Sequence, residues 1–208
     1  MDLQYYGANC VTITTKNARV VVDDNLADIG GKAVLKTGDI ALFTGVHQAA
    51  SQTAKIVIDQ PGEYEVSGVS MYGIAARAHM DEENKKNTTM YKLVVDDVRI
   101  LITGHIYPEL SDAQLETIGM VDIMIVPVGG NGYTLDAVGA LKVIKQVEPK
   151  MIIPTHYDIE GLSLPVPQQP LEEALKVLAM EPKETTTKLK IKGSELAEGT
   201  NLVILERS

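Results

Sequence analysis

The sequence contains one cysteine, no tryptophan, one phenylalanine and four histidines in 208 residues. A single cysteine excludes an intrachain disulfide, which agrees with a reducing compartment, so we expect a cytoplasmic protein. Cys10 opens an alternating β-like run, and no basic residue or helix start adjoins it in the sequence. We therefore expect Cys10 to be a small buried residue and not a nucleophile.

Long apolar runs and an excess of positive charge are also missing. No run approaches the roughly 18 apolar residues that a membrane-spanning helix needs, and the first ten residues lack a basic region followed by an apolar one. The net charge is −9, from 28 acidic and 19 basic residues, which disfavours nucleic acid or a membrane as the main partner and leaves room for a local basic groove. We expect a small-molecule substrate.

Short β-like segments dominate the first half of the chain. Residues 3–7, 10–15 and 18–23 are rich in β-branched and aromatic side chains and are separated by turns, which predicts a meander of strands. The polar stretch 79–89 predicts an exposed loop between two further strands. With 45% hydrophobic residues the chain can bury one sizeable core, and we expect one domain over residues 1–208.

Helix signals alternate with strand signals in the second half. Ser111 and Gln114 predict a capping box for a short helix, and the apolar run 121–128 predicts a strand covered on both faces. Thr134 is expected to cap a second helix over residues 134–147. This alternation indicates an α/β protein with helices as outer layers.

The last 40 residues predict one more helix and a closing hairpin. Pro170 can begin an amphipathic helix, in which Glu172 and Lys176 form an i,i+4 pair. The runs 185–193 and 200–206 then predict the two strands of the hairpin.

Each of the four histidines follows a strand-like segment; they are His47, His79, His105 and His156. Strands that end at one edge of a sheet bring distant positions together, and imidazole is a common metal ligand and general base. The pattern predicts a shared site. The alternative, in which each histidine caps or packs at its own strand end, stays open.

A series of motifs in order is similar to the metallo-β-lactamase fold superfamily, in particular to its small bacterial metal-dependent hydrolases related to ascorbate-6-phosphate lactonase. The motifs, between Leu3 and Asp158, are YYG, VVVDD, ALFTGVH, DQPGEYE, ITGHIYPEL, PVGGNGYT and IIPTHYD. The resemblance implies an α/β fold built as a four-layer αββα sandwich. It also implies one or two metal ions, usually zinc, along one edge of the two sheets.

The ligand positions of that family are only partly kept. The stretch TGVHQAA retains one histidine of the family's ligand loop, His47, and the loop's other three ligands are absent. His79 and His156 match the later and the final histidine of the family, and His105 stands where the family has a bridging aspartate. The resemblance therefore implies a single divalent metal held by His47, His79 and His105, with His156 binding substrate or assisting the metal.

Three imidazoles with an open fourth position suit zinc, and ligation by nitrogen alone also suits nickel, copper or iron. Such a hydrolase would activate water against a small anionic ester, lactone or phosphate ester. Because the family's loop aspartate and two of its histidines are absent, a second hypothesis stays open. In it the chain is a catalytically inactive binding or scaffold protein that keeps the fold and holds no metal. A homo-oligomer is compatible with either hypothesis.

Substrate contacts are expected from Tyr107, which follows His105, and from Gly130 and Tyr133 in the loop VGGNGYT. This glycine-rich loop leads into a helix start and offers backbone N–H groups to an anion, although a simple turn is equally compatible. In a metal-free variant His105 or His156 would act as the base. The orienting carboxylate would come from Asp24, Asp59 or Asp81.

Overall fold

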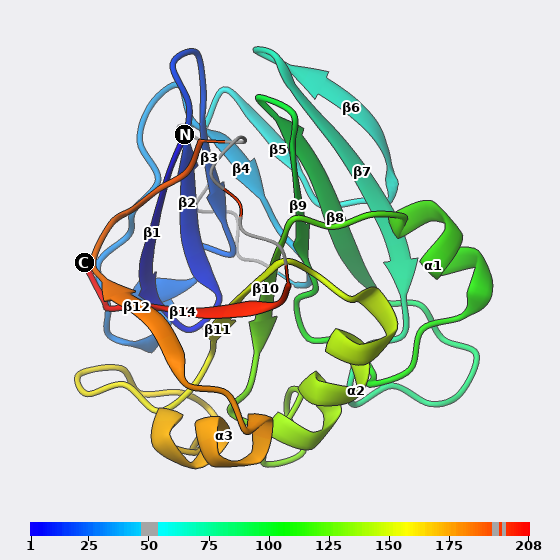
Figure 1. Cartoon of the computed structure of the whole chain (residues 1–208). Coiled ribbons are helices and arrows are strands. Elements are labelled where there is room, and N and C mark those ends of the chain that lie inside the picture. The colour runs from blue at the N-terminus through cyan, green and yellow to red at the C-terminus, as the bar shows by residue number, and fades with distance from the viewer. Residues whose placement is uncertain (47–53, 193–195, 197–198) are drawn as a thin grey trace.

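A computed structural model describes residues 1–46, 54–192, 196 and 199–208. Two β-sheets pack face to face, and the helices cover the outer side of the larger sheet (Figure 1). Most buried apolar side chains form one core between the sheets and under these helices. Within the described ranges, no helix combines the length and the apolar character needed to cross a membrane.

The smaller sheet is built mainly from the first 60 residues. In the described ranges its order is β13-β1-β2-β3-β4-β5. The strands are β1 (Asp2–Gly7), β2 (Cys10–Thr14), β3 (Arg19–Val22), β4 (Ile40–Leu42), β5 (Ile56–Ile58) and β13 (Leu189–Lys190). β1, β2 and β3 are antiparallel neighbours, which confirms the predicted meander, and β3, β4 and β5 are parallel.

The larger sheet has the order β12-β14-β11-β10-β9-β8-β7-β6 in the described ranges. Its strands are β6 (Gly62–Val66), β7 (Val69–Ala76), β8 (Thr88–Val95), β9 (Val98–Ile102), β10 (Ile123–Pro127), β11 (Met151–Thr155), β12 (Pro182–Thr186) and β14 (Asn201–Leu205). β8 is antiparallel to both β7 and β9, and β9, β10 and β11 are parallel. The carboxyl ends of β7, β9, β10 and β11 therefore point to the same edge.

Two of the helix starts test the predicted caps. The first helix, α1 (Asp112–Ile118), has the capping box of Ser111 and Gln114, which confirms the prediction. The second, α2 (Ala137–Val147), begins later than predicted, because the Asp136 carboxylate accepts from the Gly139 N–H at 2.7 Å. Thr134 is therefore not the cap. An isolated bridge between Gly129 and Asp136 keeps the preceding residues in the loop.

The C-terminal hairpin was a wrong prediction. After α3 (Leu171–Leu178), β12 and β14 lie parallel in the larger sheet, and β13 crosses to the smaller sheet beside β1. Leu189 is 4% exposed there, and Lys188 pairs with Asp2 at 2.7 Å. The burial of Leu189 against β1 thus stabilises β13 more than pairing with a strand nearby in the sequence would. In α3, Lys176 pairs with Glu173 at 2.7 Å and not with the predicted Glu172.

The outer face of the smaller sheet has a thin cover in the described ranges. A single-turn 3-10 helix, η1 (Leu26–Ile29), and the loop after it pack on this face. Cys10, Val21, Leu26 and Val34 form a small second cluster under them. Cys10 is 0% exposed, and burial raises the pKa of its thiol well above the usual value. The expectation of a buried, unreactive cysteine is confirmed.

Candidate functional site

Three of the four histidines meet where β7, β9 and β11 end. The rings of His105 and His156 are 4.6 Å apart between centroids, edge to face. The backbone N–H of His79 donates to the carbonyl of His105 at 2.7 Å. We call His79, His105 and His156 the histidine edge. The predicted fourth member, His47, lies outside the described residues.

Two of these imidazoles are oriented by oxygen acceptors. Nδ1 of His156 lies 3.3 Å from Oε1 of Gln168, and Nδ1 of His79 lies 3.4 Å from the carbonyl oxygen of Ile106. The Gln168 amide is itself fixed, because its Nε2 donates to the Val166 carbonyl at 2.7 Å. An oxygen acceptor requires a proton on Nδ1, so Nε2 keeps its lone pair in both rings. Metal-binding histidines are held in this way.

His105 is held differently. Its Nε2 lies 3.1 Å from Nδ2 of Asn9, and the Oδ1 of the same amide accepts from the Thr155 hydroxyl at 3.1 Å. The amide therefore donates to His105, whose proton must lie on Nδ1. That Nδ1 atom is buried without a hydrogen-bond partner in the described residues. Asn9 thus occupies the lone pair that His105 would offer through Nε2.

Two imidazoles of the histidine edge, His105 and His156, are neutral at ordinary pH. Burial lowers the pKa of His156 to about 4, although the Gln168 bond acts in the opposite direction. Burial, reinforced by the nearby His156 and His79, holds the pKa of His105 well below its usual value. Desolvation disfavours the imidazolium form in both rings. Neutral imidazoles are the form that coordinates a metal ion.

The donors available at this edge suit a cation that prefers imidazole. His79 and His156 each present a free Nε2, and His105 can add a third nitrogen if Asn9 releases it. Within the described ranges, no three His, Cys, Asp or Glu side chains are already arranged to hold an ion. The chemistry of the donor set fits a divalent metal. Completing the set requires a shift of Asn9 or a ligand from elsewhere.

Aromatic rings border the histidines on two sides. The ring of Tyr133 lies 5.0 Å from that of His105 and 5.8 Å from that of His156, measured between centroids. The ring of Tyr107 lies 6.4 Å from that of His79, and the Arg77 guanidinium carbon lies 3.8 Å above the Tyr107 ring. The predicted neighbours Tyr107 and Tyr133 are therefore beside the histidine edge. Arg77 adds a positive charge to it.

Two glycines let the strand ends approach closely. A Cβ on Gly104 would lie 2.5 Å from Oγ1 of Thr44, whose hydroxyl donates to Asp23 at 2.7 Å. Thr44, two residues after β4, therefore lies directly against the backbone that follows β9. A Cβ on Gly129 would lie 2.0 Å from the carbonyl oxygen of His156. Only glycine fits at these positions, so the backbone of the edge is tightly constrained.

Some predicted residues have other roles. The carboxylate of Asp24 accepts from the Val34 and Leu35 N–H groups at 2.7 Å each, and Asp81 accepts from the Ala78 N–H at 3.2 Å. Both carboxylates therefore stabilise loops, and neither orients a histidine in the described structure. Asp59 precedes β6, and its role stays a prediction.

The glycine-rich loop is largely self-bonded. The N–H of Gly130 donates to the Leu135 carbonyl at 3.0 Å, and the N–H of Tyr133 donates to the Gly130 carbonyl at 3.3 Å. These two hydrogen bonds are internal to the loop, as expected for the simple turn, and the anion role of the loop stays a prediction. Asp136 already caps the helix that follows.

Asn9, Gln168 and Arg77 were missed by sequence reasoning. Asn9 appeared only as part of a turn after the first strand, and Gln168 lies in a proline-rich loop without a motif. Their partners are 96 residues away for Asn9 and 12 residues away for Gln168.

Comparisons with known proteins identify the family of the chain. The model of a family described as "Beta-lactamase superfamily domain" matches residues 2–156. A UPF0173 metal-dependent hydrolase of Pyrococcus horikoshii is 26% identical over 138 residues, which are 64% of this chain and 59% of that protein. A UPF0173 protein of Pyrococcus abyssi is 22% identical over 182 residues, covering 77% of this chain and 85% of that protein.

Solved structures show the same fold. A candidate Zn-dependent hydrolase of the metallo-β-lactamase superfamily from Thermotoga maritima superposes with a TM-score of 0.74 at 23% identity, covering 99% of this chain and 98% of that chain. A metallo hydrolase from Ignicoccus hospitalis gives a TM-score of 0.62 at 16% identity, covering 99% and 94%. The expected two-sheet α/β fold of this superfamily is confirmed.

Proposed function

Because this chain belongs to the family described as "Beta-lactamase superfamily domain", we propose that it is a metal-dependent hydrolase acting at the histidine edge. One observation carries the proposal: His79 and His156 both direct Nδ1 to an oxygen acceptor and so keep Nε2 for a cation. The name of the Pyrococcus horikoshii relative, a metal-dependent hydrolase, supports the same activity.

The ion would be held by the Nε2 atoms of His79 and His156, with His105 and His47 as the further ligands. Such an ion would supply Lewis acidity and a more acidic bound water. Zinc is the default metal, and nickel or iron also accept imidazole ligands. The residues around the ion orient its ligands: Gln168 and the Ile106 carbonyl fix two rings, and Asn9 sets the tautomer of His105.

The substrate in this proposal is a small anionic ester, lactone or phosphate ester. Arg77 supports that choice, since its guanidinium carbon lies 3.8 Å above the Tyr107 ring, and that ring lies 6.4 Å from the ring of His79. Two hydrogen bonds to the Asp81 carbonyl, at 3.0 and 2.8 Å, fix Arg77 without neutralising it. A fixed, unpaired guanidinium attracts a carboxylate or phosphate. Tyr133 would cover the opposite side of the substrate.

A second candidate is a binding protein that keeps the fold without catalysis. The observation in its favour is the hydrogen bond from Asn9 to His105 at 3.1 Å, which occupies the Nε2 lone pair of His105. In this candidate the buried imidazoles are structural groups. Their hydrogen bonds to Asn9 and Gln168 would then stabilise the sheet edge.

Metal content separates the two candidates. Protein purified without a histidine tag is stripped, loaded in turn with Zn, Ni, Mn and Fe, and analysed for bound metal. The same samples are assayed against a panel of esters, lactones and phosphate esters. The hydrolase requires about one metal per chain and turnover with at least one substrate, and both should be lost in His79→Ala and His156→Ala.

Tyr72→Ala is the matched control, because it removes an exposed ring from β7 away from the histidine edge. It should keep the metal and the activity. Absence of all four metals and of all hydrolysis would reject the hydrolase and favour the binding protein. If Tyr72→Ala lost as much metal as the histidine variants, the loss in those variants would reflect damage to the fold and not removal of a metal ligand.

A further inference from the structure

A cavity of about 430 Å³ lies on the outer face of the smaller sheet, where η1 and the following loop cover it. Its apolar part is formed by Tyr6, Leu26 and Val34. Its rim carries four basic side chains: Arg19, Lys32, Lys36 and Arg207. We call this cavity the basic pocket. Its volume is that of a site for a small molecule.

Three of the four cations have no acidic partner. In the described ranges, no carboxylate forms an ion pair with Lys32 or Lys36, and Arg207 donates to the backbone carbonyl of Glu160 at 2.9 Å. Arg19 is neutralised by Asp39 at 2.5 Å. No Asp or Glu is among the described lining residues. Ser208, the last residue of the sequence, also lines the pocket and carries a carboxylate, but Lys32, Lys36 and Arg207 outnumber it, so the pocket is locally positive.

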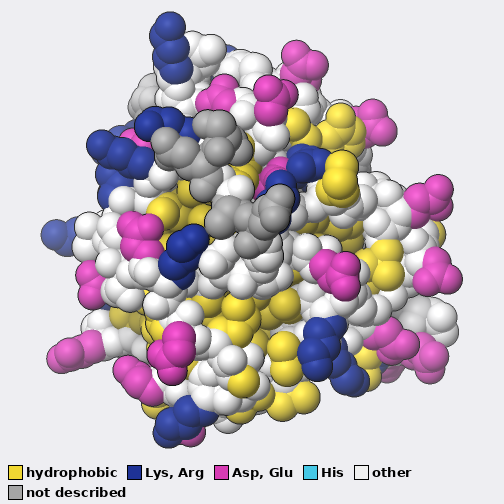
Figure 2. All heavy atoms as spheres, viewed as in Figure 1, with side chains coloured by type: hydrophobic (Ala, Val, Ile, Leu, Met, Phe, Trp, Pro, Cys, Tyr) yellow, Lys and Arg dark blue, Asp and Glu magenta, His cyan; other side chains and the backbone are white. Residues whose placement is uncertain are grey.

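This local charge opposes the rest of the molecule. The chain carries a net charge of −9, and on the face shown in Figure 2 acidic and basic side chains are interspersed. The basic pocket collects four of the 19 lysines and arginines around one cavity. Cations gathered without acidic partners repel one another, so their arrangement favours an anion between them.

The wall of the pocket is fixed before any ligand arrives. The Asp24 carboxylate accepts from the Val34 and Leu35 N–H groups at 2.7 Å each, and Asp39 accepts from the Lys36 N–H at 2.7 Å. Arg19 donates to the Val34 carbonyl at 3.3 Å. These bonds hold the loop above the sheet at a set distance. A preformed pocket loses little entropy on binding.

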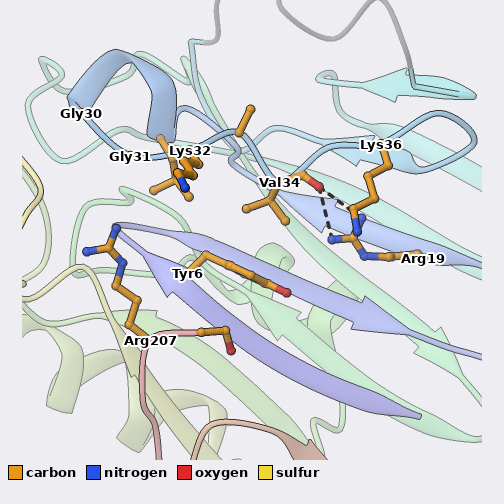
Figure 3. Close-up of a pocket in the computed structure, with 11 residues that line it drawn as sticks. Tyr6, Arg19, Gly30, Gly31, Lys32, Val34, Lys36 and Arg207 are labelled. Carbon is orange, nitrogen blue, oxygen red and sulfur yellow. Dashed lines mark hydrogen bonds between the residues drawn. The ribbon is translucent and has the colours of Figure 1, made fainter.

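The floor of the pocket presents an aromatic ring. Because residues alternate along β1, Tyr5 enters the core and Tyr6 faces outward into the pocket. In Figure 3 the Tyr6 ring lies between Arg207 and Arg19, with Val34 and Lys32 across the cavity from it. The floor suits an apolar or planar body, and the rim suits a phosphate.

We propose that the basic pocket binds a small organic phosphate that carries an aromatic body. The phosphate lies at the end of the pocket where Figure 3 shows Lys32 and Arg207, and the aromatic body packs on Tyr6. This site is separate from the histidine edge, since none of its described lining residues is a histidine. Its occupancy does not depend on a metal or on hydrolysis.

Titration calorimetry on the metal-free protein tests the proposal with phenyl phosphate, inorganic phosphate and phenol as probes. Phenyl phosphate should bind at least tenfold more tightly than either of the other two, because it alone uses both the rim and the floor. The double variant Lys32→Gln/Lys36→Gln should weaken phenyl phosphate at least tenfold. Lys142→Gln/Lys145→Gln, which removes the same charge from α2, should leave binding within twofold.

A Tyr6→Leu variant adds a test of the floor. It should weaken phenyl phosphate about threefold or more and leave inorganic phosphate unchanged. The double variant His79→Ala/His156→Ala should bind phenyl phosphate like the wild type. Three results would each overturn the proposal. In the first, the lysine pair of the pocket and the lysine pair of α2 weaken binding equally. In the others, the histidine variant loses binding, or the wild type does not bind phenyl phosphate at millimolar concentration.

Discussion

Two adjacent tyrosines of β1 face two chemically opposite regions. The Tyr5 hydroxyl donates to the Ala8 carbonyl at 3.0 Å and lies 3.2 Å from the backbone nitrogen of His156, at the histidine edge. Tyr6 forms part of the basic pocket on the other face of the sheet. One strand thus carries a buried, uncharged site on one side and an open, cationic cavity on the other.

The difference between the regions shows how each controls charge. At the histidine edge burial keeps His105 and His156 neutral, and the amides of Asn9 and Gln168 fix the lone pairs of these two rings. At the basic pocket, solvent supports full charges on lysine and arginine, and two aspartates hold the wall. Neutral ligands suit a cation, whereas exposed cations suit an anion.

The largest effect is expected where the histidine edge is packed most tightly. In Gly129→Ala the new Cβ would lie 2.0 Å from the His156 carbonyl oxygen and 2.3 Å from Oε1 of Gln168. Both groups must move, so the free energy of unfolding should fall by on the order of 3 to 5 kcal/mol in urea denaturation. Gly132→Ala is the control in the same loop. It meets nothing within 4 Å and, at φ +75°, should cost only about 1 to 2 kcal/mol. Equal losses would contradict the packing argument.

The neutrality of the histidine edge can be measured as a pH dependence. The pKa of His156 is about 4 in the folded protein, whereas the unfolded imidazole has a value of about 6.5. Between these values the unfolded chain binds more protons, so lowering the pH destabilises the fold. The His156 contribution is on the order of 3 kcal/mol over this window.

Metal-free wild type and His156→Gln should therefore differ in slope between pH 6.5 and 4. The variant should lose part of the slope, and the remainder should come from His105, whose pKa is also depressed by burial. Lys32→Gln, in the basic pocket, should leave the slope unchanged. A slope that is the same in His156→Gln and the wild type would mean that His156 is not held neutral.

The wall of the basic pocket predicts a smaller loss. Asp24→Asn keeps an acceptor oxygen but removes the charge that strengthens the two bonds to Val34 and Leu35, which are 2.7 Å each. Stability should fall by about 1 to 2 kcal/mol, measured by thermal unfolding. The exposed Asp28→Asn in η1 serves as the control and should cost less than about 0.5 kcal/mol. If both variants behave alike, Asp24 does not brace the wall.

The smallest effect concerns the tautomer of His105. Asn9→Ala removes two hydrogen bonds of 3.1 Å, one to His105 and one from Thr155, and should cost about 1 to 2 kcal/mol. Its sharper readout is nitrogen NMR, where the wild-type ring should carry its proton on Nδ1 and the variant should show a mixture of tautomers. Asn17→Ala, in an exposed turn, should leave the His105 signals unchanged. A wild-type ring protonated on Nε2 would contradict the role given to Asn9.

Local sequence signals determined much of the secondary structure. The meander of the first strands, the buried strand β10 and the Ser111–Gln114 capping box all follow from short-range side-chain patterns and local hydrogen bonds. The family motifs also indicated the fold, because they occur in order along most of the chain. The prediction failed at β12 and β13, because β13 pairs with β1 near the start of the chain and β12 pairs with β14 in the parallel direction. Local residue patterns specify neither the partner nor the direction of a strand.

The sequence has a histidine after each of β7, β9 and β11. Because these three strands run in the same direction, their histidines lie at the same edge of the sheet. Tertiary structure alone decided which nitrogen of each ring is free, because Asn9 and Gln168 arrive from loops that carry no motif. It also decided the basic pocket, whose cations come from β3, the loop after η1 and the end of the chain. Charge and hydrogen bonding depend on distances in space, which local residue patterns do not specify.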